Sequence, residues 1–236
     1  MKYSSVVKAP RTGNAHFSAF QVNHRFFGGL MDPILGFDHF RLTGDVFGPH
    51  RHAGMSAVSY VFEDSVPYHN EDSMGTDLTI TPGSLLWTWA GSGVVHHEIP
   101  TVQGEVHGLQ LFLDIAPANK SLPPKSVFIP VEKMPVKTSE GVSVKVVMGD
   151  NGIQTPEPIT LLDVSLKADN VFDYTLSKGW NGTVYVLSGT VALDKNSLGD
   201  NEAIAFGGAA TADEKLRFTA AIDSRFLLIS GPPVKI

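Results

Sequence analysis

The chain has 236 residues, of which 42% are apolar and 18% are charged, as in folded globular proteins rather than disordered ones. The net charge is −6 and no basic cluster occurs, which excludes direct nucleic-acid binding. The chain contains no cysteine, so disulfides, thiolate metal ligands and a catalytic thiol are excluded. No apolar run reaches transmembrane length, and the first eight residues lack the apolar core of a secretory signal. We therefore expect a cytoplasmic protein (nuclear also, if the source is eukaryotic) without a membrane partner.

Short runs of β-forming residues recur along the whole chain between Gly and Pro turns, and no long run has the 3.6-residue period of a helix. Many short strands at even spacing predict an all-β fold of sandwiches or barrels. Hairpins are predicted around a loop at 69–75 and over 182–193. The other predicted strands are 37–42, 56–62, 85–89, 108–115, 142–148, 159–166, 171–176, 203–206, 215–219 and 226–230.

A cluster of prolines over residues 116–141 interrupts the strand pattern and indicates a connection between two lobes, with a short helical turn. The division we expect is an N-terminal lobe over 1–120, an inter-lobe connection over 121–141 and a C-terminal lobe over 142–236. No histidine follows His107. If the lobes are similar barrels, only the first can therefore hold a metal through imidazoles.

Two short segments carry the residues with the clearest chemistry. One contains His50 and His52, and the other contains His96 and Glu98. Residues i and i+2 of a strand point to the same face of a sheet. If the two segments are paired strands, three imidazoles and one carboxylate meet and form a site for a first-row transition metal.

A single His-x-His pair on a strand is more often part of a polar face than a pair of metal ligands. The second pair, together with the intervening turn at Pro82-Gly83, favours the metal site. His97 lies between the predicted ligands and should face the other way, as a surface or packing residue. His39 is interpreted as a structural histidine.

Three neutral imidazoles and one carboxylate, without a thiolate, suit Fe, Mn, Ni, Co or Cu more than a closed structural zinc site. Four protein ligands leave two positions of an octahedron for water, O2 or a chelating substrate. The expected cofactor is therefore one divalent transition metal, Zn included among the alternatives.

Several longer motifs are similar to those of a known family. The spacing from Gly44 to His52 is that of the first cupin motif, and the broader run resembles the pirin family of bicupin proteins. The resemblance is carried by the segments His50-Arg51-His52, Tyr60-Val61-Phe62-Glu63-Asp64, 69–75, 82–87, 90–100, Gly108-Leu109-Gln110-Leu111 and Gly179-Trp180-Asn181. It implies an all-β bicupin fold with two β-barrel (double-stranded β-helix, jelly-roll) lobes, and Fe(II) as the metal on His50, His52, His96 and Glu98.

The resemblance implies two classes of function. Some bacterial pirins resemble quercetin 2,3-dioxygenases, which open a flavonol ring with O2. In that case Glu98 is the catalytic general base, and a small aromatic substrate and O2 bind at the metal. Trp87, Trp89, Phe40 and Phe47 could form the apolar walls, although aromatic residues are more often core.

The alternative is a non-enzymatic iron-dependent regulator that binds a transcription factor or a metabolic enzyme. A third reading is a site whose metal only stabilises the barrel. The chain has Ser56 and Ala53 where many pirins have a glutamate and an arginine. Small residues near the first histidine pair favour room for a ligand, so the enzyme is preferred. Pirins usually continue beyond the last strand, and the different ending after Gly231 predicts a different packing of the lobes.

Overall fold

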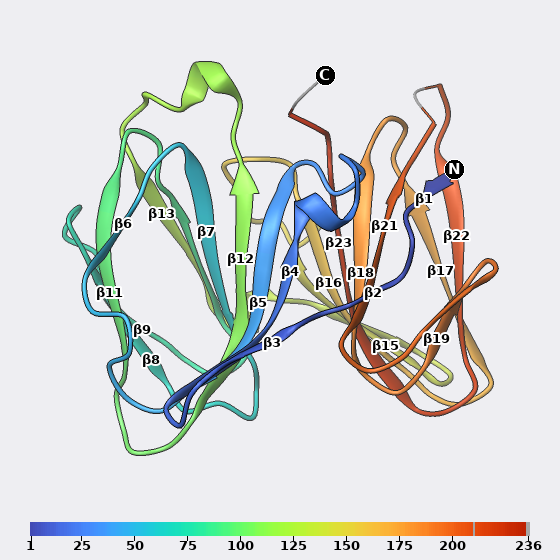
Figure 1. Cartoon of the computed structure of the whole chain (residues 1–236), viewed down its shortest axis with the longest axis horizontal. Helices are drawn as coiled ribbons and strands as arrows, with labels where there is room; N and C mark the ends of the chain where they lie inside the picture. The colour runs from blue at the N-terminus through green and yellow to red at the C-terminus, as the bar shows by residue number, and fades with distance from the viewer. Residues whose placement is uncertain (210, 235–236) are drawn as a thin grey trace. The chain divides into compact units, whose positions relative to one another are not determined.

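The structure is a computed structural model that describes residues 1–209 and 211–234, and it contains two compact β units (Figure 1). The histidine unit comprises Pro10–Val22 and Ile34–Lys133. The C-terminal unit comprises Met1–Ala9, Asn23–Pro33 and the residues from Met134 onward. Two N-terminal segments, which the predicted division places in the first lobe, are thus grouped with the C-terminal strands. The first contains β1 (Lys2–Tyr3) and β2 (Val7–Lys8), which pair with β21 (Glu202–Gly207). In the second, the Asp32 carbonyl accepts a hydrogen bond from Asn181 Nδ2 at 2.9 Å.

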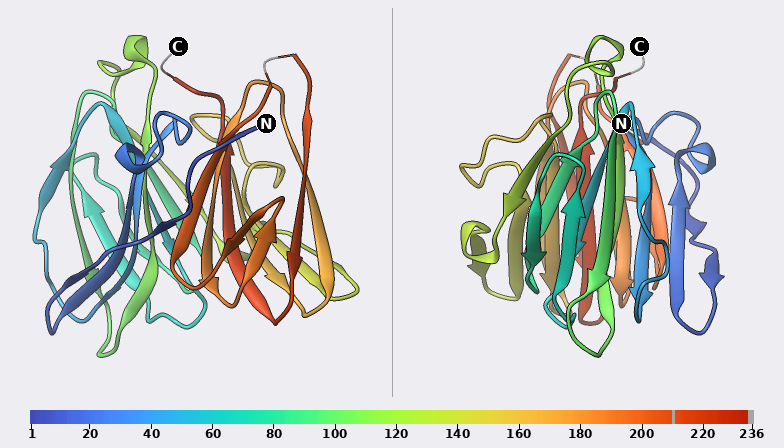
Figure 2. Two further views of the ribbon diagram at one scale, coloured as in Figure 1. Left: turned by 45° about the vertical axis from the view of Figure 1, so that its right-hand side comes forward. Right: turned by 90° about the vertical axis from the view of Figure 1, so that its left-hand side faces the viewer.

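The histidine unit consists of two antiparallel sheets that face each other (Figures 1 and 2). Residues of both sheets line a cavity. The seven-stranded sheet has the order β13-β10-β7-β12-β5-β4-β3, and the four-stranded sheet has the order β6-β11-β8-β9. The strands are β3 (Arg11–Gly13), β4 (Phe17–Asn23), β5 (Ile34–Leu42), β6 (His50–His52), β7 (Met55–Val61), β8 (Tyr68–Asp72), β9 (Asp77–Ile80), β10 (Leu85–Trp89), β11 (Val94–Pro100), β12 (Val106–Asp114) and β13 (Lys125–Ile129).

The C-terminal unit repeats this plan with an eight-stranded and a four-stranded sheet. The larger sheet has the order β1-β21-β18-β23-β16-β15-β14, with β2 also paired to β21, and the smaller has the order β17-β22-β19-β20. The strands are β1 (Lys2–Tyr3), β2 (Val7–Lys8), β14 (Val136–Ser139), β15 (Val142–Met148), β16 (Thr160–Leu166), β17 (Asn170–Leu176), β18 (Asn181–Ser188), β19 (Val191–Leu193), β20 (Asn196–Leu198), β21 (Glu202–Gly207), β22 (Glu214–Ala220) and β23 (Ser224–Gly231).

The helices of the described residues are three short 3₁₀ turns, η1 (His24–Phe26), η2 (Pro117–Asn119) and η3 (Val131–Lys133). Within the described chain, none of the helices has the length and apolar character needed to cross a bilayer. The all-β bicupin prediction is confirmed. The alternation of residues along the strands explains the fold, because apolar side chains of both sheets point inward and form each core. In the histidine unit Phe40 and Val61 of the larger sheet belong to the same core cluster as Ile80 of the smaller sheet.

Two local predictions differ from the structure. The hairpin predicted over 182–193 is wrong: β18 pairs with β21 and β23, whereas β19 pairs with β20 and β22 in the other sheet. The chain turns at Gly189, where φ is +89°, and changes sheets there. The expected connection over 116–141 contains more structure than predicted, because β13 pairs along its length with β10. The hairpin near 69–75 is present, but His69 lies within β8.

Gly108 allows β7 and β12 to approach closely, and this pairing supports the cavity floor. A Cβ atom at Gly108 would lie 2.5 Å from the backbone oxygen of Tyr60. Because backbone cannot move as a side-chain end can, we expect Gly108→Ala to destabilise the protein by about 1–3 kcal/mol. Chemical denaturation with urea measures this change. Gly199→Ala is the control, since its nearest neighbour would be the Glu202 side chain at 3.8 Å. Equal stability of the two variants would contradict the packing argument.

Candidate metal centre

The pairing of β6 with β11 places the histidines. In this antiparallel pair His50 lies directly opposite His96, and His52 lies opposite Val94. The chain enters β11 through Gly93, whose φ is +139° and whose Cβ would lie 2.2 Å from the Arg51 guanidinium. Arg51 in turn donates to the Ser92 carbonyl at 2.8 Å. Glycine at this position therefore lets Arg51 close over the turn on the side opposite the histidines.

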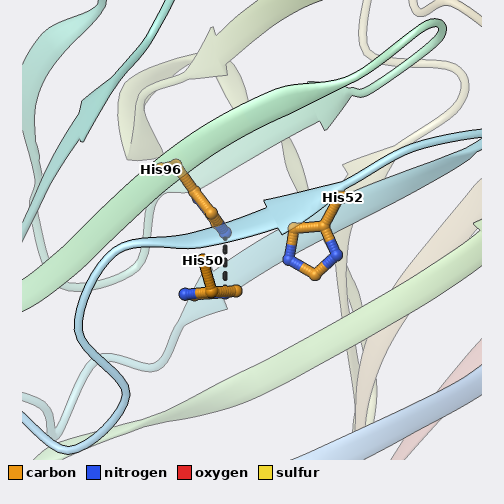
Figure 3. Close-up of side chains that lie close together, drawn as sticks. All are labelled: His50, His52 and His96. Atoms are coloured by element: carbon orange, nitrogen blue, oxygen red, sulfur yellow. Dashed lines mark hydrogen bonds between the residues drawn. The ribbon is translucent and has the colours of Figure 1, made fainter.

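Three imidazoles converge on one point, as Figure 3 shows. One ring nitrogen from each of His50, His52 and His96 lies within 4.8 Å of the others. The Nε2 atoms of His50 and His96 are 3.0 Å apart. The His52 ring centroid is 5.0 Å from each of the other two ring centroids. The predicted convergence of the two strand segments is thus present for all three histidines.

The other ring nitrogens of His50 and His96 are held by oxygen atoms. His50 Nδ1 is 3.0 Å from the Gly48 carbonyl oxygen, and His96 Nδ1 is 3.1 Å from Asn70 Oδ1. The Gly48 carbonyl oxygen can only accept, so His50 Nδ1 carries the proton and His50 Nε2 presents a lone pair toward His96. His96 has the same tautomer when Asn70 is placed with Oδ1 toward it. These orienting partners are the kind that metal-binding histidines use, and the sequence alone did not reveal them.

Burial keeps the histidines in the form that binds cations. Burial, and after it the neighbouring imidazoles, lower the pKa of His52 and of His96 to about 4. The His96 side chain is almost fully buried. Near neutral pH these two rings are therefore uncharged, as metal ligands must be.

The distance between the Nε2 atoms of His50 and His96 fits two ligands of one divalent transition metal. Two nitrogens bound at about 2.1 Å and at a right angle would be about 3.0 Å apart, which matches the His50–His96 distance of 3.0 Å. The residues present therefore fit a divalent transition metal.

Glu98 is buried in the same cavity as the histidines. Burial raises its pKa, and a hydrogen bond from the Ser59 hydroxyl to Oε1, at 2.6 Å, acts in the opposite direction. Its Oε2 lies 3.9 Å from His96 Nδ1. Within the described residues the group whose donor atoms lie together consists of the three histidines, without Glu98. The role of Glu98 as a fourth ligand stays a prediction.

A hydrogen-bond chain on the facing sheet holds the Glu98 carboxylate. Ser59 has one hydroxyl proton but faces two oxygens, Glu98 Oε1 at 2.6 Å and Gln110 Oε1 at 2.9 Å. Gln110 Nε2 is buried and has no partner in the described part of the chain. A half-turn of the amide exchanges its two ends, after which Nε2 donates to Ser59 and Ser59 donates to Glu98. We assign the bonds in this order, because the single Ser59 proton cannot serve two acceptors.

The site opens into a cavity of about 230 Å³ with mainly aromatic walls. Phe40 and Phe47 line it, as expected, whereas Trp87 and Trp89 are buried outside its walls. Burial raises the pKa of Tyr68, whose phenol therefore stays protonated. The lining residues are Phe17, Asp38, Phe40, Leu42, Phe47, His50, His52, Tyr68, Glu98, Gln110 and Phe112.

The two histidines that we set aside behave as expected. His97 faces away from the cluster, with Nε2 2.9 Å from Asp45 Oδ2. His39 Nε2 is 2.8 Å from His107 Nε2, and neither residue lines the cavity. Sequence reasoning missed Asp38, Tyr68, Gln110 and Phe112. Asp38 could have been predicted, because it lies two residues before Phe40 on β5 and therefore faces the same side of the sheet.

Comparison with known proteins gives matches along most of the chain. Residues 9–113 match the Pirin family, and residues 161–236 match the Pirin C-terminal cupin domain. Pirin of Mus musculus is 30% identical over 224 residues, which cover 87% of this chain and 73% of the relative.

Two solved structures share the fold. A quercetin 2,3-dioxygenase of Acinetobacter baumannii has a TM-score of 0.86 at 22% identity, over 99% of this chain and 88% of the other. The bacterial pirin YhhW of Escherichia coli in complex with nickel(II) has a TM-score of 0.78 at 16% identity, over 99% of this chain and all of the other. Together with the two matched domains and the murine relative, they lead to one conclusion: the chain belongs to the pirin family of two-domain cupins.

Proposed function

We propose that this protein is a metal-dependent dioxygenase that acts on flavonol-type or other small aromatic substrates. The observation that carries the proposal is the convergence of three imidazoles, His50, His52 and His96, beside an aromatic cavity. A nickel(II)-bound bacterial pirin and a quercetin 2,3-dioxygenase with the same fold support it.

His50, His52 and His96 would hold the metal, with Glu98 as the fourth ligand. The family resemblance favours Fe(II), and Mn, Ni, Co, Cu and Zn suit the same donor set. When bound, the metal supplies a Lewis acid with open positions for a deprotonated hydroxyl and O2. It would also stabilise the charged form of Glu98, whose burial otherwise favours the neutral acid.

The chain's own groups prepare the substrate. Glu98, charged beside the metal, would take the proton from the substrate hydroxyl as the general base. The Ser59 hydroxyl fixes Oε1, which leaves Oε2 to accept the proton. Phe40, Phe47 and Phe112 give the ring flat apolar walls, which exclude water from the reacting edge.

Reconstitution tests the proposal. Protein loaded separately with Fe(II), Mn(II), Ni(II), Co(II) or Cu(II), with the metal content measured, should consume O2 when quercetin is added. His52→Ala should abolish turnover, because it removes one of three converging ligands. His97→Ala is the matched control, since its ring faces away from the site, and it should keep full turnover. Loaded protein that consumes no O2 with any metal would reject the dioxygenase and favour the iron-dependent regulator, to be sought by partner pull-down.

Glu98→Gln separates binding from proton transfer. Glutamine keeps the size of the side chain and an acceptor for Ser59, so the metal should be retained. Because the amide cannot accept the proton, we expect kcat to fall by about 100-fold or more. Single-turnover rates on protein of verified metal content measure this. Unchanged activity would remove Glu98 from the role of base.

The metal-free protein should lose stability on mild acidification. Above pH 6.5, His52 and His96 are neutral in both the folded and the unfolded chain. Between pH 6.5 and about 4 the unfolded chain binds protons that the folded chain refuses, so the free energy of unfolding falls. For the buried His96 the loss approaches roughly 3 kcal/mol. Urea unfolding in chelator at pH 7, 6 and 5 measures it.

His96→Gln should flatten this pH dependence, whereas His97→Gln should leave it nearly unchanged. An equal slope in wild type and His96→Gln would show that burial of this ring does not control the acid response.

A further inference from the structure

We propose that the Asp38 carboxylate binds a second hydroxyl of the substrate, at the end of the ring opposite the metal. The site would then select compact aromatic ligands of one or two fused rings that carry a hydroxyl at each end. This inference rests on the proposed function, which places one edge of the ligand at the metal. Asp38 would then determine which ligands bind, by recognising the opposite edge.

A row of polar residues crosses the inner face of the seven-stranded sheet. Ser59 on β7 is the register partner of Gln110 on β12, and Gln110 is the register partner of Asp38 on β5. Neighbouring strands lie about 4.8 Å apart, so the row spans roughly 10 Å from Ser59 to Asp38. Ser59 contacts Glu98 at the histidine end. Asp38 therefore lies at the far end of the same cavity wall.

Asp38 has unused capacity to accept hydrogen bonds. Within the described residues its hydrogen bond comes from Gln21 Nε2 to Oδ1, at 3.1 Å. Burial raises the pKa of Asp38, and Gln21 only partly offsets this effect. A carboxylate offers about four lone-pair positions. The remaining acceptor positions suit a neutral donor such as a hydroxyl.

The size and walls of the cavity restrict the ligand further. Its volume of about 230 Å³ is below the usual range for drug-sized ligands of about 300–1,000 Å³. Phe40, Phe47 and Phe112 provide faces for a planar ring. Phe47 is 55% exposed, so it stands at the mouth, where a larger substituent can leave the cavity. The small volume and the exposed position of Phe47 both agree with a ligand whose two fused rings lie inside the cavity and whose third ring, if present, lies outside it.

A hydroxyl that donates to a carboxylate makes a charge-assisted hydrogen bond. A ligand without that hydroxyl displaces water from Asp38 and leaves its oxygens unpaired. A site that hydrogen-bonds a ligand hydroxyl discriminates strongly against an analogue without that hydroxyl. Apolar walls discriminate less strongly between ligands that differ only in size. Asp38 should therefore discriminate between two ligands that differ by one hydroxyl.

The test uses two probes that share a metal-binding edge, 3-hydroxychromone and 3,7-dihydroxychromone. Calorimetry with Zn(II)-loaded protein, in which no turnover occurs, gives the two Kd values. Wild type should bind the 3,7-dihydroxy probe about tenfold or more tightly than the other. Asp38→Ala should reduce the ratio to about one, and the isosteric Asp38→Asn should give an intermediate value. Glu140→Gln, an exposed carboxylate outside the cavity, should leave the ratio unchanged.

Equal affinity of wild type for both probes would overturn the inference, as would a preference that survives Asp38→Ala or a failure of both probes to bind. Melting temperatures near that of wild type identify variants that are folded. The outcome is separable from that of the proposed function. Quercetin-dependent O2 uptake without the hydroxyl preference would reject only the role of Asp38, whereas the preference without O2 uptake would reject only the dioxygenase.

Discussion

The histidine unit is organised around three imidazoles whose ring nitrogens converge across the β6–β11 pair, with Nε2 of His50 and Nε2 of His96 3.0 Å apart. The Gly48 carbonyl accepts a hydrogen bond from His50 Nδ1, and Asn70 Oδ1 lies 3.1 Å from His96 Nδ1, so both rings are oriented toward the same point. A close pair of ring nitrogens alone does not indicate a metal centre, because His39 and His107 also form one, at 2.8 Å. The third converging imidazole, His52, is what indicates a metal centre.

The same burial that favours metal binding makes Glu98 sensitive to the metal. In the apolar cavity its charged form is disfavoured, and Ser59 offsets only part of that cost. A divalent ion among the imidazoles would add a large positive charge within a region of low dielectric, and it would reverse the direction of the shift. Metal loading and the protonation state of Glu98 are consequently coupled, which suits a group that must bind the ion and also exchange a proton with a substrate.

The histidine cluster was predictable from the sequence because its geometry is local. The period of two along a strand aligns His50 with His52 and also His96 with Glu98, and only the pairing of two strands had to be assumed. The hairpin over 182–193 failed for the opposite reason: pairing partners such as β23 lie far along the chain, and a Gly turn does not reveal a change of sheet. Asp38 and Gln110 were not predicted as site residues, because their place beside Ser59 depends on the register of three neighbouring strands, which the sequence does not reveal.

The C-terminal unit shows what this sandwich becomes without a cluster of imidazoles inside. No histidine occurs after residue 107. Its two sheets are joined by rings: Phe218 on β22 lies 5.8 Å from Phe172 and 5.2 Å from Phe226, between ring centroids. Such packing needs no ion and no hydrogen-bond partners. The histidine unit instead contains buried imidazoles, a carboxylate and an amide, each of which must be satisfied. The C-terminal unit forms the same architecture without an imidazole cluster in its core. The fold therefore does not need the three histidines of the histidine unit, which indicates that they serve binding.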